Sequence, residues 1–306
     1  MLRPLLIAAL AVVSGCSAPA LAPDRTPHQA YADALADVGL DSTRLGRLWL
    51  AAARPDADTA VVALPAARTL EVDAARPSAL ALWVRVRPGE TFTAEVAPAL
   101  GDSGLAFVDL LSVARGDSLT FTPVESRVSR GDTVRVEWSS DDVGADVSLV
   151  LRVQPELLAD GGVGVRVAAR PSLGFPVAGA GPQAIRSVWG DPRDGGARRH
   201  EGVDIFADRG TPVVATSDGV VDRVQETPIG GRVVWLRPSG RRLGVYYAHL
   251  DSQLVASGQR VRAGDTLGLV GNTGNARSTP PHLHFGVYAS GGAVDPDPFI
   301  VGRPSP

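Results

Sequence analysis

The segment that decides the fold of this chain is PHLHFGVY, residues 281–288, in which two histidines stand two positions apart. Side chains two residues apart in an extended strand lie on the same face, so His282 and His284 are expected to point the same way. A second segment, RHEGVDIF at residues 199–206, places a histidine and an aspartate four positions apart, which gives the same expectation. The two segments predict two strands that present metal-binding groups to one side of a β-sheet.

The histidines are concentrated in one part of the sequence. Four of the five lie between positions 200 and 284, although a single histidine is ordinarily a surface or core residue. Two neutral imidazoles and one carboxylate suit Zn²⁺, and three protein ligands leave a fourth position open for water, as catalytic zinc sites do. The candidate residues for such a site are His200, Asp204, His249, His282 and His284.

The segments around these residues resemble the lysostaphin/LytM-type zinc metallopeptidases, a family of peptidoglycan endopeptidases with a duplicated hybrid motif. The resemblance is carried by RHEGVDIFADRGTPVVATSDGVV (199–221), YYAHL (246–250), VRAGDTLGLVGNTG (261–274) and PHLHFGVY (281–288). It extends from about residue 175 to residue 299 and does not include residues 17–170. One departure is NARSTPP (275–281), which lacks the glycine often found just before the Pro-His-Leu-His and so bears on substrate detail.

The resemblance implies a role for each candidate residue. His200, Asp204 and His284 would bind one zinc ion per chain, and His249 and His282 would stand beside the open coordination position as catalytic histidines. The implied activity is hydrolysis of peptide bonds in bacterial peptidoglycan, in cross-links or in glycine-containing bridges. An imidazole titrates near neutrality, so either His249 or His282 could take a proton from water, and the sequence leaves that division open.

Three other functions share some of these sequence features. A wall-binding lipoprotein with an unused cleft could scaffold or activate another cell-wall hydrolase, and a protease could act on glycine-rich extracellular proteins. A cupin dioxygenase would also use a His-x-His pair, but a nearby glutamate ligand is missing from FGVYASGG (285–292). A pI near 6.0 and a formal net charge of −3 argue against a nucleic-acid partner.

The N-terminus is typical of a lipoprotein signal peptide, predicted over residues 1–15. Arg3 precedes LLIAALAVV (5–13), a run too short to span a bilayer, and Val-Ser-Gly-Cys then ends at Cys16, which resembles the lipobox cysteine. Lipidation of Cys16 would anchor the chain to a membrane outside the cytoplasm, in the cell envelope. Ser17 is no aspartate-type retention signal, which favours the outer membrane, facing the periplasm.

The remaining sequence predicts a mainly β chain: an N-terminal β-sandwich-like domain with a short helical segment, then a small antiparallel β metallopeptidase domain. Apolar residues at helical spacing precede many short segments with a period of two. The isolated His28 is expected at the surface. The predicted division after the signal peptide is a tether and short helices at 16–60, the β-sandwich at 61–154, a linker at 155–174 and the metallopeptidase domain at 175–302.

Overall fold

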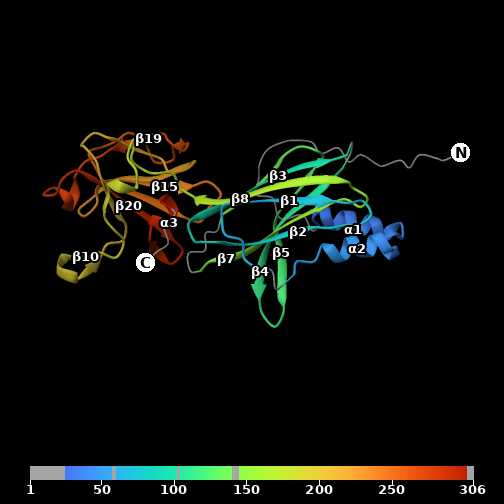
Figure 1. The fold of residues 1–306 in the computed structure, drawn as a ribbon. Helices are drawn as coiled ribbons and strands as arrows, with labels where there is room; N and C mark the ends of the chain where they lie inside the picture. The colour runs from blue at the N-terminus through green and yellow to red at the C-terminus, as the bar shows by residue number, and fades with distance from the viewer. Residues whose placement is uncertain (1–24, 57–59, 102–103, 140–144, 302–306) are drawn as a thin grey trace.

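The computed structural model describes residues 25–56, 60–101, 104–139 and 145–301, which form two lobes joined end to end (Figure 1). A helical pair and a β-sandwich make up the N-terminal lobe, and a second set of antiparallel strands makes up the C-terminal lobe. The predicted fold class, mainly β with a short helical segment and a small antiparallel C-terminal domain, is confirmed. Among the described residues, no helix is long and apolar enough to cross a membrane.

The helical pair begins with well-defined caps. In α1 (Pro27–Asp37) the Thr26 hydroxyl accepts from the Gln29 backbone N–H at 3.1 Å, and the Gln29 side chain accepts from the Thr26 backbone N–H at 2.8 Å. This reciprocal capping box satisfies two N–H groups that a helix start leaves unpaired. After the 3-10 turn η1 (Leu40–Ser42), α2 (Arg44–Ala52) begins at its own threonine cap.

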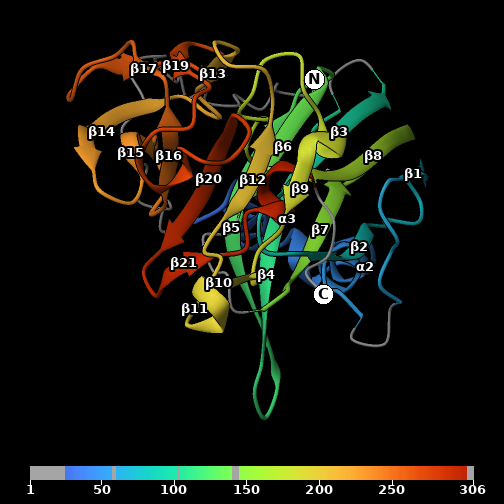
Figure 2. The same cartoon turned by 90° about the vertical axis from the view of Figure 1, so that its left-hand side faces the viewer.

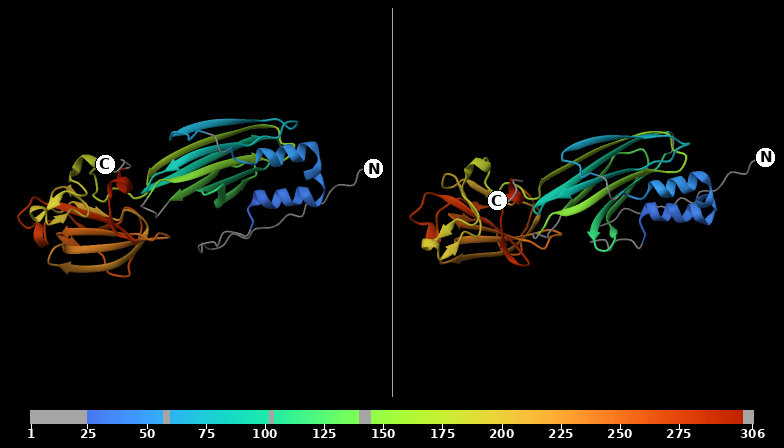
Figure 3. Two further views of the ribbon diagram at one scale, coloured as in Figure 1. Left: turned by 90° about the horizontal axis from the view of Figure 1, so that it is seen from below. Right: turned by 60° about the horizontal axis from the view of Figure 1, so that its bottom comes forward.

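The β-sandwich consists of two four-stranded antiparallel sheets packed around one apolar core. The first sheet has the order β1-β8-β3-β6 and the second the order β2-β7-β4-β5. The two helices cover part of the outer face of the second sheet (Figure 3). The strands are β1 (Ala66–Val72), β2 (Leu80–Val86), β3 (Glu90–Leu100), β4 (Ala106–Arg115), β5 (Leu119–Ser129), β6 (Val134–Ser139), β7 (Val147–Pro155) and β8 (Gly161–Pro171).

The expected linker at 155–174 is wrong for most of its length, because it contains strand β8. This strand pairs with β1 on one side and β3 on the other, and Val163, Val165 and Val167 alternate into the core. Of the two glycines that suggest a break, Gly161 is required by close packing. At Gly161, where φ is 130°, a Cβ would lie 2.3 Å from the Ala99 carbonyl oxygen. Glycine fits that approach without steric cost.

The expectation that His28 is exposed is also wrong. His28 is only 5% exposed, and its ring stacks on that of Trp49 in α2 with the two ring centroids 4.9 Å apart. The His28 Nε2 lies 2.6 Å from Oε1 of Gln154 on β7. The helical pair therefore presents this histidine to the sandwich, a packing that helical periodicity does not reveal.

The C-terminal domain is built on a sheet with the order β18-β14-β15-β16-β20-β12-β9, with β21 paired to β20 and a smaller sheet β13-β19-β17 beside it (Figure 2). Its strands are β9 (Ile185–Ser187), β10 (Pro192–Arg193), β11 (Arg198–Arg199), β12 (Val203–Phe206), β13 (Pro212–Val214), β14 (Gly219–Thr227), β15 (Gly231–Pro238), β16 (Gly244–Leu250), β17 (Ser252–Gln253), β18 (Arg260–Val261), β19 (Thr266–Leu269), β20 (His282–Ala289) and β21 (Gly292–Val294). Short 3-10 turns, η2 (Pro182–Ala184), η3 (Asp194–Gly196) and η4 (Gly274–Ala276), and one short helix, α3 (Asp297–Ile300), complete the domain.

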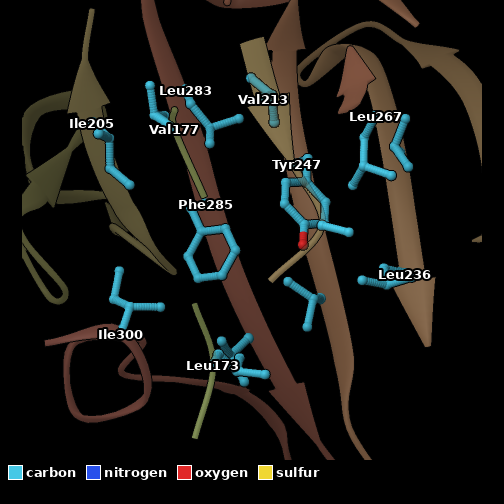
Figure 4. Close-up of a cluster of buried hydrophobic side chains, with 14 of the residues drawn as sticks. Leu173, Val177, Ile205, Val213, Leu236, Tyr247, Leu267, Leu283, Phe285 and Ile300 are labelled. Atoms are coloured by element: carbon cyan, nitrogen blue, oxygen red, sulfur yellow. The ribbon is translucent and has the colours of Figure 1, made fainter. Parts of the chain in front are cut away.

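One face of the large sheet is buried and the opposite face carries the polar segments. Phe285, Tyr247 and Ile205 come from three adjacent strands and pack into the core shown in Figure 4. Side chains alternate along a strand, so the residues directly before and after each of these three point to the opposite face of the sheet. The buried Tyr247 hydroxyl keeps a partner, since the Thr216 N–H donates to it at 3.1 Å. The core thus fixes which side chains the sheet presents to the opposite face.

A short hydrogen-bonded junction joins the two lobes. Immediately after β8, the Ser172 N–H donates to the Gly89 carbonyl at 2.9 Å in the sandwich. The next residue, Leu173, donates to the Phe299 carbonyl of α3 at 2.9 Å. The connection between the lobes is therefore short, and these two consecutive N–H groups tie it to both of them.

Candidate metal centre

Three predicted residues converge on the polar face of the large sheet. Nε2 of His200, Oδ1 of Asp204 and Nδ1 of His284 lie 3.0 Å from one another in all three pairings. Asp204 on β12 and His284 on β20 are directly paired in the sheet register, which places their side chains side by side. His200 and Asp204 are buried and His284 is partly buried.

The structural reason that His200 joins this group differs from the expected one. His200 precedes β12 and does not share a strand with Asp204. It is held by the β10–β11 hairpin, where its backbone N–H donates to the Asp191 carbonyl at 2.8 Å and its carbonyl accepts from the Gly190 N–H at 2.9 Å. The turn between His200 and Asp204 contains Gly202, at which a Cβ would lie 2.7 Å from Cε1 of His284. Glycine at position 202 is therefore needed for the His284 imidazole to reach its position beside His200.

The hydrogen bonds of His200 show which nitrogen is available as a ligand. Its Nδ1 lies 2.9 Å from the Val188 carbonyl oxygen, which can only accept, so Nδ1 carries the proton. In the neutral ring, Nε2 then holds the lone pair that faces Asp204 and His284. A hydrogen bond to the opposite nitrogen fixes the tautomer in this way at most histidine metal sites.

The electrostatics of the cluster favour a cation. Burial alone would raise the pKa of Asp204, but the imidazoles of His200 and His284 beside it outweigh burial and hold that pKa well below its usual range. Burial lowers the pKa of His284, so its ring is neutral at neutral pH. One carboxylate and two imidazoles are a zinc donor set, and the 3.0 Å spacing of their ligand atoms lets one ion contact all three at about 2 Å. The residues present therefore fit the metal.

The other two predicted residues lie beside this cluster. The ring centroid of His249 is 5.1 Å from that of His282 and 5.8 Å from that of His284. His282 Nε2 lies 4.0 Å from Asp204 Oδ1, and its ring stacks on Phe206 at 5.0 Å. All five predicted residues thus surround one space, whereas Cys16 lies outside the described residues.

Both of these histidines use Nδ1 to bind a backbone carbonyl. His249 Nδ1 donates to the Thr273 oxygen and His282 Nδ1 donates to the Pro280 oxygen, each at 2.9 Å. In the neutral rings Nε2 is therefore the unprotonated nitrogen. Burial, followed by the nearby His284 and His282, lowers the pKa of His249 to about 4. The His249 ring is therefore neutral at neutral pH.

The backbone of His249 is held in an uncommon conformation. Its φ is 62°, in the left-handed region that few non-glycine residues adopt. Two backbone hydrogen bonds fix it there: its N–H donates to the Gly230 carbonyl at 2.8 Å, and its carbonyl accepts from the Thr273 N–H at 3.3 Å. Such conformations persist where the surroundings over-determine them, and they cluster at functional sites.

The five residues lie in a cleft of about 630 Å³ on the polar face of the sheet. Sequence reasoning did not select the other side chains that shape it. Three aromatic rings on β15, β16 and β20 form one wall: Trp235 and Tyr246 have centroids 4.6 Å apart, and Trp235 and Tyr288 have centroids 4.9 Å apart. Arginines from the β10–β11 hairpin, Arg193 and Arg199 among them, form part of the opposite side. Arg199, Tyr246 and Tyr288 lie inside the segments that carry the family resemblance, whereas Trp235 and Arg193 lie outside them.

Comparison with known proteins identifies the class to which this domain belongs. Residues 198–296 match the model of peptidase family M23, and the C-terminal domain of the chain is a member of that family. Zinc is accordingly its cofactor, and the donor set of the cluster fits that ion.

Individual relatives match the same part of the chain. The chain is 38% identical over 138 residues to a protein of Bacillus subtilis named L-Ala–D-Glu endopeptidase. The matched region covers 41% of this chain and 42% of the relative. The chain is 39% identical over 100 residues to the peptidoglycan DD-endopeptidase ShyC of Vibrio cholerae, and that match covers 33% of this chain and 22% of the relative. A solved zinc-containing peptidase of Vibrio cholerae is 34% identical, with 41% of this chain and 39% of that chain covered and a TM-score of 0.37. The chain thus spans less than half of the length of these relatives.

Proposed function

We propose that this chain is a zinc metalloendopeptidase that hydrolyses peptide bonds in bacterial peptidoglycan. The observation that carries the proposal is the cluster of His200, Asp204 and His284 with two further histidines beside it in one cleft. A relative named as a peptidoglycan DD-endopeptidase supports the substrate class. A structural zinc site would use four protein ligands, whereas three leave a coordination position for catalysis.

In this proposal His200, Asp204 and His284 hold the ion and His249 and His282 handle protons. A bound zinc ion supplies a Lewis acid that activates water and polarises the scissile carbonyl. His249 and His282 accept a proton at Nε2 and later return one to the departing amine, because their Nδ1 atoms are already committed to carbonyls. The protonated imidazole also stabilises the negative charge that develops on the substrate oxygen.

The surroundings of the cleft suit an extended peptide. Gly286 lies on the strand that carries His282 and His284, and a Cβ there would lie 3.1 Å from Cε2 of Tyr288, so the glycine leaves room for that aromatic ring to pack over the strand. The wall of Trp235, Tyr246 and Tyr288 supplies apolar contact area.

Incubation of the purified full chain with peptidoglycan tests the activity, with the muropeptides then separated and weighed. The expected result is new peptides that carry a free amino terminus at the scissile bond, produced by the zinc-loaded protein and not after removal of the metal by a chelator. A zinc-loaded chain that leaves the muropeptides unchanged would favour the scaffolding role instead.

Lipidation of Cys16 is a second part of the proposal. The apolar run LLIAALAVV followed by Val-Ser-Gly-Cys supports an anchor at this residue, which is the only cysteine in the sequence. The enzyme would then act from the surface of a membrane in the cell envelope, outside the cytoplasm and facing the wall, with the outer membrane favoured. In detergent phase partitioning the native protein should enter the detergent phase and Cys16→Ser should not. Recovery of the native protein in the aqueous phase alone would contradict the anchor.

A further inference from the structure

The carboxylate of Asp204 has two oxygens with different partners. Oδ1 faces His200 Nε2 and His284 Nδ1, each at 3.0 Å. Oδ2 accepts a hydrogen bond from Nη2 of Arg193 at 2.8 Å, and the Asp204 side chain is only 12% exposed. A charge-assisted hydrogen bond of this kind is about twice as strong as a neutral one. One oxygen is therefore directed to the metal cluster and the other is occupied.

We infer that Arg193 is a positioning residue of the metal centre, which keeps Asp204 a ligand through Oδ1 alone. The inference deepens the proposed function and rests on it. Carboxylates bind metal ions through one oxygen or through both. If Oδ2 were free to turn toward the ion, Asp204 could occupy the position that substrate and water need. By holding Oδ2, Arg193 preserves the open position on which the proposed catalysis depends.

Arg193 is also linked to the second ligand. The same Nη2 donates to the Ser187 hydroxyl at 2.6 Å, and that oxygen lies 3.2 Å from His200 Nδ1. The Ser187 hydroxyl donates its own proton to Asp191 Oδ2 at 2.9 Å, so its lone pairs remain for the arginine and the imidazole. Arg193 therefore holds Asp204 directly and braces the proton-bearing side of His200 through Ser187.

The hairpin provides a matched control. Arg199 follows Arg193 in the same hairpin and also lines the cleft, but its Nη1 donates to the backbone carbonyl of Gly190 at 3.2 Å. The Arg193 side chain is 31% exposed, whereas Arg199 is an exposed residue. Removal of either arginine takes one positive charge from the same hairpin, and only Arg193 contacts a metal-ligand candidate.

Metal binding by the full chain, without substrate, tests the inference. Zinc affinity is measured by competition with a chromophoric chelator, and coordination is followed by the visible absorption of the Co²⁺-substituted protein. Arg193→Ala should weaken zinc binding by about 10–100-fold, as loss of outer partners of metal ligands typically does. Its Co²⁺ bands should lose intensity, because a second Asp204 oxygen raises the coordination number. Arg193→Lys should recover part of both properties, since it keeps one charged donor.

Arg199→Ala should match the parent protein in affinity and in the Co²⁺ spectrum. An Arg193→Ala protein with the zinc affinity and Co²⁺ spectrum of the parent overturns the inference, even if hydrolysis falls, because the arginine would then act on substrate. If Arg193→Ala does not fold, Arg193→Lys is compared with Arg193→Gln instead. A Co²⁺ spectrum like that of the parent in both variants overturns the inference. A changed spectrum in Arg193→Gln alone supports it. A parent protein that binds no metal is a different failure, which strikes the proposed function itself.

Discussion

The two lobes each bury histidine, and the comparison between them separates a structural imidazole from a chemical one. In the N-terminal lobe, Nε2 of His28 is taken by Gln154, whose side-chain NH₂ donates in turn to the Trp49 carbonyl at 2.8 Å. In the C-terminal lobe, backbone carbonyls accept from Nδ1 of His249 and His282, and Nε2 is the ring nitrogen left for chemistry. Burial is similar at 5% exposure for His28 and 7% for His249, so it does not distinguish the sites. The two kinds of site differ in whether Nε2 remains available, as it does in His249 and His282 but not in His28.

The largest expected difference follows from removing a metal ligand. His284→Ala should lose most of the bound zinc and reduce peptidoglycan hydrolysis to background, because only two donor residues remain. His28→Ala, measured beside it, should keep one zinc per chain. Metal analysis of the purified proteins checks both. Full zinc occupancy in His284→Ala would show that the ligand set is wrong.

A smaller loss is expected at the two proton-handling histidines. His249→Ala and His282→Ala should each keep zinc and lose about 10²–10⁴-fold in rate, the usual effect of one positioned acid–base group. The double variant should lose less than the product of the two, since both groups serve one transition state. Rates on purified peptidoglycan and zinc content are measured for all three proteins. A zinc-free His249→Ala would move that residue into the ligand set, and a fully active one would remove it from the mechanism.

The N-terminal histidine should show the opposite pattern. His28→Ala leaves the buried Gln154 oxygen without its partner and removes the ring stacked on Trp49. Loss of one partner of a buried hydrogen bond typically costs about 1–3 kcal/mol of unfolding free energy. Denaturant unfolding measures this cost, and zinc content should not change. A variant that lost zinc or activity while its stability was intact would break the distinction between the two lobes.

The smallest effect concerns the pH dependence of stability. Burial, and then the charge of Arg152, lowers the pKa of His28 from 6.5, so the folded lobe favours the neutral ring. This contribution to stability is present above pH 6.5 and is lost as the pH falls from there through the folded-state pKa. In unfolding measurements, His28→Leu should flatten the stability curve on the acidic side of pH 6.5. An unchanged slope would show that His28 is not held neutral.

The sequence identified the metal-bearing segments because their residue types and spacing reflect the chemistry directly. His282 and His284 lie on one strand, as their spacing predicted, and Asp204 lies opposite His284 in the sheet register. The approach of His200 depends instead on a hairpin turn, which spacing in a strand does not describe. The assigned roles of the five residues stay predictions until the variants are measured.

What the sequence did not reveal depends on contacts between distant segments. The glycine pair at the start of strand β8 suggests a linker, but Gly161 is needed because the strand passes close to Ala99, and that approach is a tertiary property. The burial of His28 depends on docking of the helical pair, and Arg193 belongs to no recognisable motif. These features follow from packing geometry, whereas the histidine motif follows from local spacing.

Mass analysis of muropeptides released by the zinc-loaded full chain, compared with the His284→Ala protein, tests the central claim most directly. The account predicts peptides cleaved at one peptide bond by the parent protein, and an unchanged muropeptide pattern with His284→Ala. An unchanged pattern with a parent protein that holds one zinc ion per chain would contradict it.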